Sequence, residues 1–149
     1  MLVLVGAPVL ATPKSAFDIS ENGLEILDSQ LTVFKDPSAR MTIEEVAEAD
    51  RQGRFQPATS KSLLPGYTRE AIWASINLRN DSSIWQRRFI EVTPPRLRNI
   101  HLFMPENNRW SRAASRISIP VEERLIQARR PTFSINLAPG EVREIYIRV

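Results

Sequence analysis

Arginine and aromatic side chains are the residues of this chain whose chemistry is best suited to holding a ligand. Of the 20 Lys and Arg residues, 17 are Arg. A guanidinium forms paired hydrogen bonds with a carboxylate or phosphate, and a flat aromatic ring stacks on the apolar face of a sugar ring or a base. The candidate ligand-binding residues are Trp73, Arg79, Phe103, Trp110, Arg112, Tyr146 and Arg148. Trp73 and Trp110 would serve as platforms, and the arginines would favour an acidic glycan or another anionic small ligand.

Catalytic and metal chemistry have little support in the sequence. His101 is the single histidine and there is no cysteine, so a metal site of the His/Cys type and thiol catalysis are excluded. There is no G-x-S-x-G turn, and the neighbours Glu44 and Glu45 would point in different directions on a helix. We therefore predict no enzyme activity, no catalytic residue, no metal and no cofactor, and we expect His101 to be an outward-facing surface residue.

The charge pattern raises the question of nucleic acid. The net charge is +3, and residues 79–130 hold 11 basic against 5 acidic side chains. These arginines are spread over several expected strands and loops, with no basic helix and no nucleic-acid-binding motif. A solvated basic surface explains them better, so nucleic acid is not an expected partner.

The stretch from Gly66 to Asp81 organises the chain. Apolar residues occupy alternate positions from Ile72 to Leu78, with polar residues between them, which predicts a strand with one face on a core and one toward water. Trp73 falls on the face predicted to be wet. Either a bulge near Ala71 turns the indole inward as core, or the ring stands exposed as a ligand platform.

The other elements are short. The capping-box spacing of Thr42 and Glu45 predicts one helix to about residue 50, and Phe55 is expected to plug the loop after it. Strands are expected around residues 24–26, 31–33, 84–92, 99–104, 117–120, 129–137 and 142–149. In the strand at 84–92, the core-facing side cannot be chosen. The predicted core includes Ile72, Ala74, Ile76, Leu78, Ile100, Leu102, Ile145 and Ile147.

About eight short strands and one helix favour an all-β sandwich or barrel. A length of 149 residues suits a single domain. We place this domain at residues 23–149, after a flexible lead-in at 12–22. Residues 1–11 are apolar and end in small residues, which is typical of the end of a secretory signal, although a buried first strand is the alternative.

A family resemblance extends from about Leu31 to Val149. It is carried by the run GYTREAIWASINLRN, a later I-x-L-F-x-P strand and the closing L-A-P-G-E-x-x-x-I-Y-I-R-V. Together they resemble the type 2 extracellular domain of the 7TMR-DISM receptors, bacterial membrane receptors with diverse intracellular signalling modules. The resemblance implies a jelly-roll-like antiparallel β-sandwich, similar to carbohydrate-binding modules, that senses a ligand in the periplasm.

The partners implied are a carbohydrate or other anionic small ligand, the membrane segments of the same receptor, and a second copy in a homodimer. The alternative is a structural or dimerisation domain without its own ligand, in which the same aromatic residues would be interface anchors. These functions are distinguished by whether the aromatic residues line a polar groove, form a flat apolar patch, or are buried.

Overall fold

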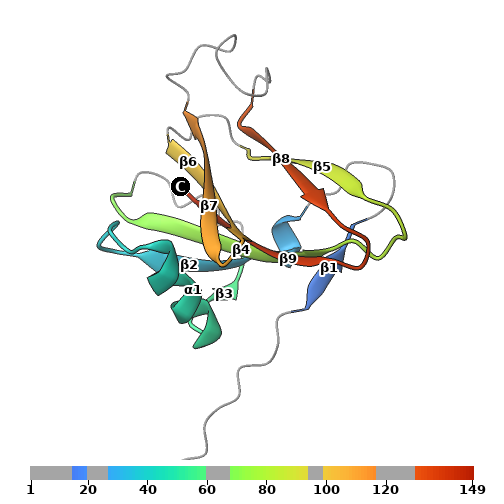
Figure 1. The fold of residues 1–149 in the computed structure, drawn as a ribbon. Helices are drawn as coiled ribbons and strands as arrows, with labels where there is room; N and C mark the ends of the chain where they lie inside the picture. Colours follow the sequence, from blue (N-terminus) through green and yellow to red (C-terminus); the bar gives the residue numbers. More distant parts are fainter. Residues whose placement is uncertain (1–14, 20–26, 60–67, 94–98, 117–129) are drawn as a thin grey trace, which may run out of the picture.

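The fold is an all-β sandwich whose largest sheet has a helix on one face and a two-stranded sheet on the other. Figure 1 shows these layers in a computed structural model, in which residues 15–19, 27–59, 68–93, 99–116 and 130–149 are described. The strands are β1 (Ala16–Asp18), β2 (Thr32–Asp36), β3 (Gln56–Pro57), β4 (Ala71–Arg79), β5 (Gln86–Glu91), β6 (Asn99–Glu106), β7 (Arg109–Arg116), β8 (Thr132–Leu137) and β9 (Val142–Arg148). The helices are α1 (Ile43–Arg51) and the short 3₁₀ turn η1 (Asp28–Gln30).

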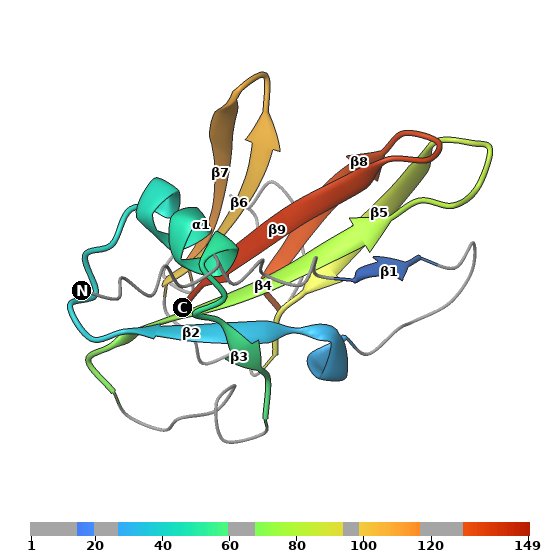
Figure 2. The ribbon, with the colours of Figure 1, turned by 90° about the horizontal axis from the view of Figure 1, so that it is seen from below.

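The large sheet has the strand order β3-β2-β4-β9-β6-β7, with β1 added beside β4. All of its pairings are antiparallel except that between β1 and β4. β5 and β8 form the second sheet, also antiparallel. In Figure 2 the β6–β7 hairpin projects beyond the rest of the large sheet.

β4 is the central strand, as the alternation predicted. Its partner β9 places Ile76 opposite Ile145, and both are buried together with Leu102 on the neighbouring strand β6. This face packs against Phe133, Ile135 and Leu137 of β8 in one mostly aliphatic cluster, which we call the aliphatic cluster. Of the predicted core, Ile72, Ile76, Leu78, Ile100, Leu102 and Ile145 are buried, while Ala74 and Ile147 are partly exposed.

The opposite face of β4 was predicted to be wet, and this is wrong for Trp73 and Ser75, although Arg79 on the same face is exposed. Helix α1 and Phe55 cover this face, so Trp73 is only 1% exposed and Ser75 is completely buried. No bulge is involved, because the pairing of β4 with β2 and β9 runs in unbroken register through Trp73. Alternation tells which side chains share a face, but not whether a second layer covers that face.

The start of α1 follows from local sequence. Thr42 accepts a hydrogen bond from the Glu45 amide, and the Glu45 carboxylate accepts one from the Thr42 amide, which completes the expected capping box. Just before it, buried Asp36 accepts hydrogen bonds from Ser38 and from the Met41 amide, closing the loop between β2 and the helix. α1 therefore enters at a fixed position over the sheet.

The pairing of β5 with β8 shows which side of β5 faces the core. Phe133, Ile135 and Leu137 of β8 point inward, and their partners on β5 are Ile90, Arg88 and Gln86. Phe89 therefore lies on the outer face, where it is 57% exposed, and Trp85 just before the strand is 69% exposed.

Asn80 ties the two sheets together at the end of β4. Its buried side-chain amide donates to the carbonyls of Ile84, Leu137 and Ala138, and its oxygen accepts from Ser82. Gly140, at φ +71°, completes the turn between β8 and β9 that meets this side chain.

Part of the expected organisation lies outside the described residues: the apolar stretch at 1–11 and the strands expected around 24–26 and 117–120. The lead-in expected at 12–22 includes β1, and Ile19 after it is buried in the aliphatic cluster. The large sheet therefore includes residues that precede position 23.

Candidate functional site

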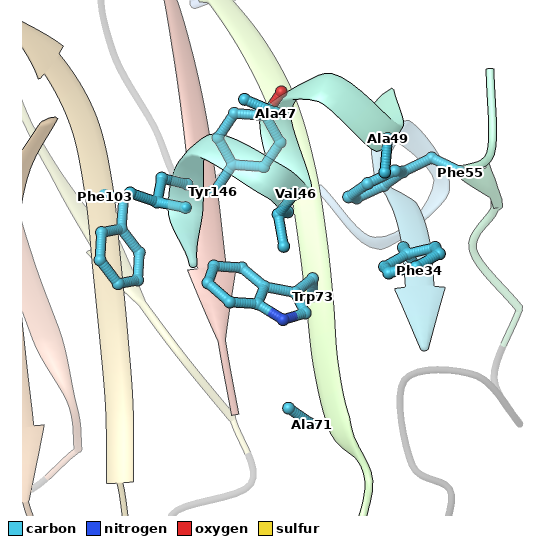
Figure 3. Packing of buried hydrophobic residues seen from close by; sticks show 10 residues of the cluster. Phe34, Val46, Ala47, Ala49, Phe55, Ala71, Trp73, Phe103 and Tyr146 are labelled. Carbon is cyan, nitrogen blue, oxygen red and sulfur yellow. The ribbon is translucent and has the colours of Figure 1, made fainter. Parts of the chain in front are cut away.

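Most of the candidate residues lie on one face of the large sheet, the face covered by α1. Trp73, Tyr146 and Phe103 belong to adjacent strands β4, β9 and β6, and the strand register places them on this same face. With Phe34 and Phe55 they form what we call the aromatic bed (Figure 3). Ring centroids lie 5.4 Å apart for Trp73 and Phe103 and 6.0 Å apart for Phe55 and Tyr146.

Three of the candidate residues are buried in this bed. Trp73 is 1%, Tyr146 0% and Phe103 9% exposed, although all three were predicted as ligand-binding residues. Val46 and Ala47 of α1 lie over the rings in Figure 3, and the small alanines bring the helix close to them. These three rings are therefore core and are not accessible platforms.

The accessible part of this face is a rim formed by Trp110, Arg112 and Arg148. Trp110 and Arg112 lie two residues apart on β7, so they share a face, and Arg148 lies near the end of β9. Trp110 is half-buried, with its ring edge-to-face on Tyr146 at 5.6 Å. The sequence prediction named all three of these residues, and the structure brings them to one face.

His101 joins this rim, although the sequence reasoning left it out. It is only 7% exposed, so the expectation of an ordinary surface histidine is wrong. One of its ring nitrogens, Nε2, lies 2.7 Å from a terminal nitrogen of Arg112, and its ring lies edge-to-face with Phe103. The available signal was its position two residues before Phe103, which puts both side chains on the same face of one strand.

Arg148 is held from two sides. It donates to the Ala39 carbonyl over 2.8 Å, and its guanidinium carbon lies 5.8 Å from the centre of the Trp73 ring. The contact with Trp73 is a cation–π interaction. The indole predicted as a ligand platform is thus used within the protein to position an arginine.

Arg79 does not join the other candidate residues. It lies six residues along β4 from Trp73, which is about 20 Å in a strand. Its guanidinium forms an ion pair with Asp18 of β1, and this hydrogen bond lowers the pKa of the Asp18 carboxyl. Its role in the structure is to hold β1 on the sheet.

A polar network crosses the aromatic bed between α1 and the sheet. The Tyr146 hydroxyl lies 3.0 Å from an Asp50 carboxylate oxygen and 2.7 Å from one of Glu144, and Ser75 donates to Asp50. Burial, reinforced by the hydrogen bond to Glu144, raises the pKa of Tyr146 far above its ordinary value of 10.0. The hydroxyl therefore keeps its proton and acts as a donor, to the carboxylate of Asp50 or to that of Glu144.

No other feature of the described residues competes with this rim. They contain no group of three or more His, Asp or Glu side chains placed to hold a metal ion. A shallow depression of about 500 Å³ lies on the outer side of α1, lined by Met41, Glu44, Glu45, Glu48, Ala49, Gln52 and Arg54. None of the candidate residues reaches it.

Comparison with known protein families decides the class of protein. Residues 28–149 match the family described as 7TMR-DISM extracellular 2. The chain belongs to this family. It is thus the extracellular sensor domain of a membrane receptor, on the periplasmic side of the membrane, and its family is not a known enzyme family.

Two further comparisons give no match: no curated protein and no solved structure is similar to the chain. Within the described ranges, no helix has the length and apolar character needed to cross a bilayer.

Proposed function

We propose that this DISM extracellular domain senses a soluble, carbohydrate-like ligand at the rim formed by Trp110, Arg112 and Arg148. The observation that supports the proposal most directly is the placement of a half-exposed indole on the same sheet face as two arginines. An aromatic ring that stacks on a sugar, with planar polar groups at its side, is the usual chemistry of sugar binding.

The proposal differs from the sequence-based site in its platform. Trp73 is core, which leaves Trp110 as the accessible aromatic ring on this face, and Arg79 is excluded by distance and by its ion pair. Trp110 is fixed by its contact with buried Tyr146, so a ligand would meet a ring that is already ordered.

Calorimetric titration with a panel of neutral and acidic oligosaccharides tests the proposal. We expect Trp110→Ala to leave the fold intact and to weaken binding by about 1–3 kcal/mol, the usual effect of removing a large aromatic contact. Trp85→Ala is the matched control, because Trp85 lies outside this face and is 69% exposed. Equal, weak binding by the wild type and both variants would reject the site.

A structural or dimerisation role is the second candidate function, and a different surface favours it. Phe89 on the outer face of the β5–β8 sheet and Trp85 just before β5 are largely exposed, and a contiguous apolar patch that included them would mark an interface. If this role holds, light scattering will show a dimer that Trp85→Ala dissociates and Trp110→Ala does not. A monomer at high concentration would exclude it for the domain alone.

A further inference from the structure

We infer that His101, Arg112 and Arg148 form a binding site for an oxyanion, the carboxylate or phosphate group of the sensed ligand. The inference rests on the proposed function, because it names the chemical group by which a ligand at this rim would be recognised. It adds a buried histidine that neither the family match nor the sequence pattern assigns to a site.

Strand register places the three residues on neighbouring strands and on one face of the large sheet. His101 on β6 lies directly opposite Arg148 on β9, which puts their Cβ atoms about 5 Å apart. Arg112 on β7 reaches back to His101, with 2.7 Å between the guanidinium nitrogen and Nε2. The cluster thus draws one residue from each of three adjacent strands.

The protonation of the cluster follows from this contact. A guanidinium always carries its protons and can only donate, so Nε2 of His101 must accept. Arg112 and Arg148 each bring a permanent positive charge to the site.

Neither arginine contacts a carboxylate within the described part of the chain. Arg112 donates to His101, and Arg148 donates to a backbone carbonyl and covers the Trp73 ring. By contrast, Arg79, Arg130 and Arg143 each form an ion pair. Since a guanidinium has five N–H groups, each of the two arginines keeps donors for an incoming anion.

The side chains are also held in position before a ligand arrives. His101 is buried against Phe103, and Arg148 is held by Trp73 and by the Ala39 carbonyl. Ala39 itself has φ +54°, and its amide donates to the Asp36 carbonyl, so the acceptor of Arg148 belongs to a closed loop. Ligand binding would therefore cost little side-chain conformational entropy, which favours affinity.

Competition between anionic and neutral probes tests the site. Inorganic phosphate, glucuronate and glucose are titrated into the wild-type domain and into Arg112→Gln and Arg148→Gln. We expect each variant to bind the preferred anion about tenfold more weakly, because charge-assisted hydrogen bonds are lost. Glucose binding should weaken less than anion binding in both variants, because a hydroxyl group forms only an ordinary hydrogen bond with these side chains.

Arg109→Gln is the matched control, since Arg109 lies three residues from Arg112 on β7 and points to the opposite face. It should bind anions as the wild type does. Arg112→Lys is the second variant: it keeps the charge, and we expect it to restore only part of the affinity, because a lysine lacks the planar fork of donors. Circular dichroism checks that every variant is folded.

The outcomes separate this inference from the proposed function. Preference for glucuronate or for phosphate identifies the oxyanion. Neutral sugar binding that depends on Trp110, without any anion binding, would overturn the oxyanion site and leave the proposed function standing. Anion binding that Arg112→Gln abolishes, without any sugar binding, would support the site and reject the carbohydrate ligand. Equal anion binding by all variants would overturn the inference.

Discussion

The two faces of the large sheet are built from different side chains. The face toward β5 and β8 is aliphatic, with Ile100, Leu102 and Ile145 fully buried. The face toward α1 is aromatic and also contains polar groups, among them Ser75 and His101. The first face therefore serves stability alone, whereas the second combines core packing with the candidate site at its rim.

This difference explains why buried polar groups gather on the α1 side. An aliphatic layer needs only complementary shape, while Tyr and His rings bring polar atoms that must find partners when they are buried. Asp50 and Arg112 supply those partners here. Helix α1 supplies one of these partners and strand β7 supplies the other.

Replacing Trp73 should produce the largest change that we predict. If the α1 face is core, Trp73→Ala will lower the free energy of unfolding by about 3–5 kcal/mol, measured by urea denaturation, because it leaves a cavity. Trp85→Ala is the matched control and should change stability by about 0.5 kcal/mol or less, since this ring is 69% exposed. Similar values for the two variants would mean that the α1 face is not packed as described.

Much of the fold could be predicted from the sequence. Alternation identified β4 and its aliphatic face, and the capping box identified the start of α1. These signals are local, within a few residues. The coverage of the second face of β4 is a contact between distant segments, so the pattern within β4 could not reveal it.

The candidate site was predicted in part for the same reason. The register places Trp110, Arg112 and Arg148 on the α1 face of the sheet, yet Phe103 and Tyr146 on the same face are buried. His101 was missed because a lone histidine carries no spacing signal. Its role depends on Arg112, eleven residues away on the next strand.

The loop that leads into α1 gives a pH-dependent test of how that helix is held. Burial by itself raises the pKa of Asp36, but hydrogen bonds from the Ser38 hydroxyl and from backbone amides outweigh it, and the pKa falls below its ordinary 3.8. The ionised Asp36 carboxylate therefore stabilises the folded state fully above pH values near 3.8. This contribution to the free energy of unfolding is lost as the pH falls through the lower pKa of Asp36 in the folded state. We expect Asp36→Asn to destabilise the protein by about 1.5–3 kcal/mol at pH 7, the range for hydrogen bonds to a charged group.

This effect is measured by urea denaturation of the wild type and of Asp36→Asn at a series of pH values from 7 downward. The difference between the two proteins should shrink once the pH passes below 3.8, when the wild-type carboxylate also gains a proton. Asp81→Asn, at an exposed turn, serves as the control and should match the wild type at neutral pH. A difference that is constant over the whole pH range would show that the charge of Asp36 does not hold the loop.

The smallest predicted effect concerns the hydroxyl of Tyr146, the polar link between the aromatic bed and α1. This hydroxyl has one hydrogen for two carboxylates, so it can complete only one strong hydrogen bond at a time, to Asp50 or to Glu144. Tyr146→Phe keeps the ring in place and should lower the free energy of unfolding by about 0.5–1.5 kcal/mol, as for a typical hydrogen bond.

Ser75→Ala removes the other hydroxyl that donates to Asp50. Combining each of the two variants with Asp50→Asn in double-mutant cycles measures how strongly each hydroxyl is coupled to the helix. Coupling for both hydroxyls is expected if Asp50 fixes the end of α1 on the sheet. Coupling for Ser75 alone would mean that Tyr146 donates to Glu144 within its own strand, and that the aromatic bed holds the helix by packing.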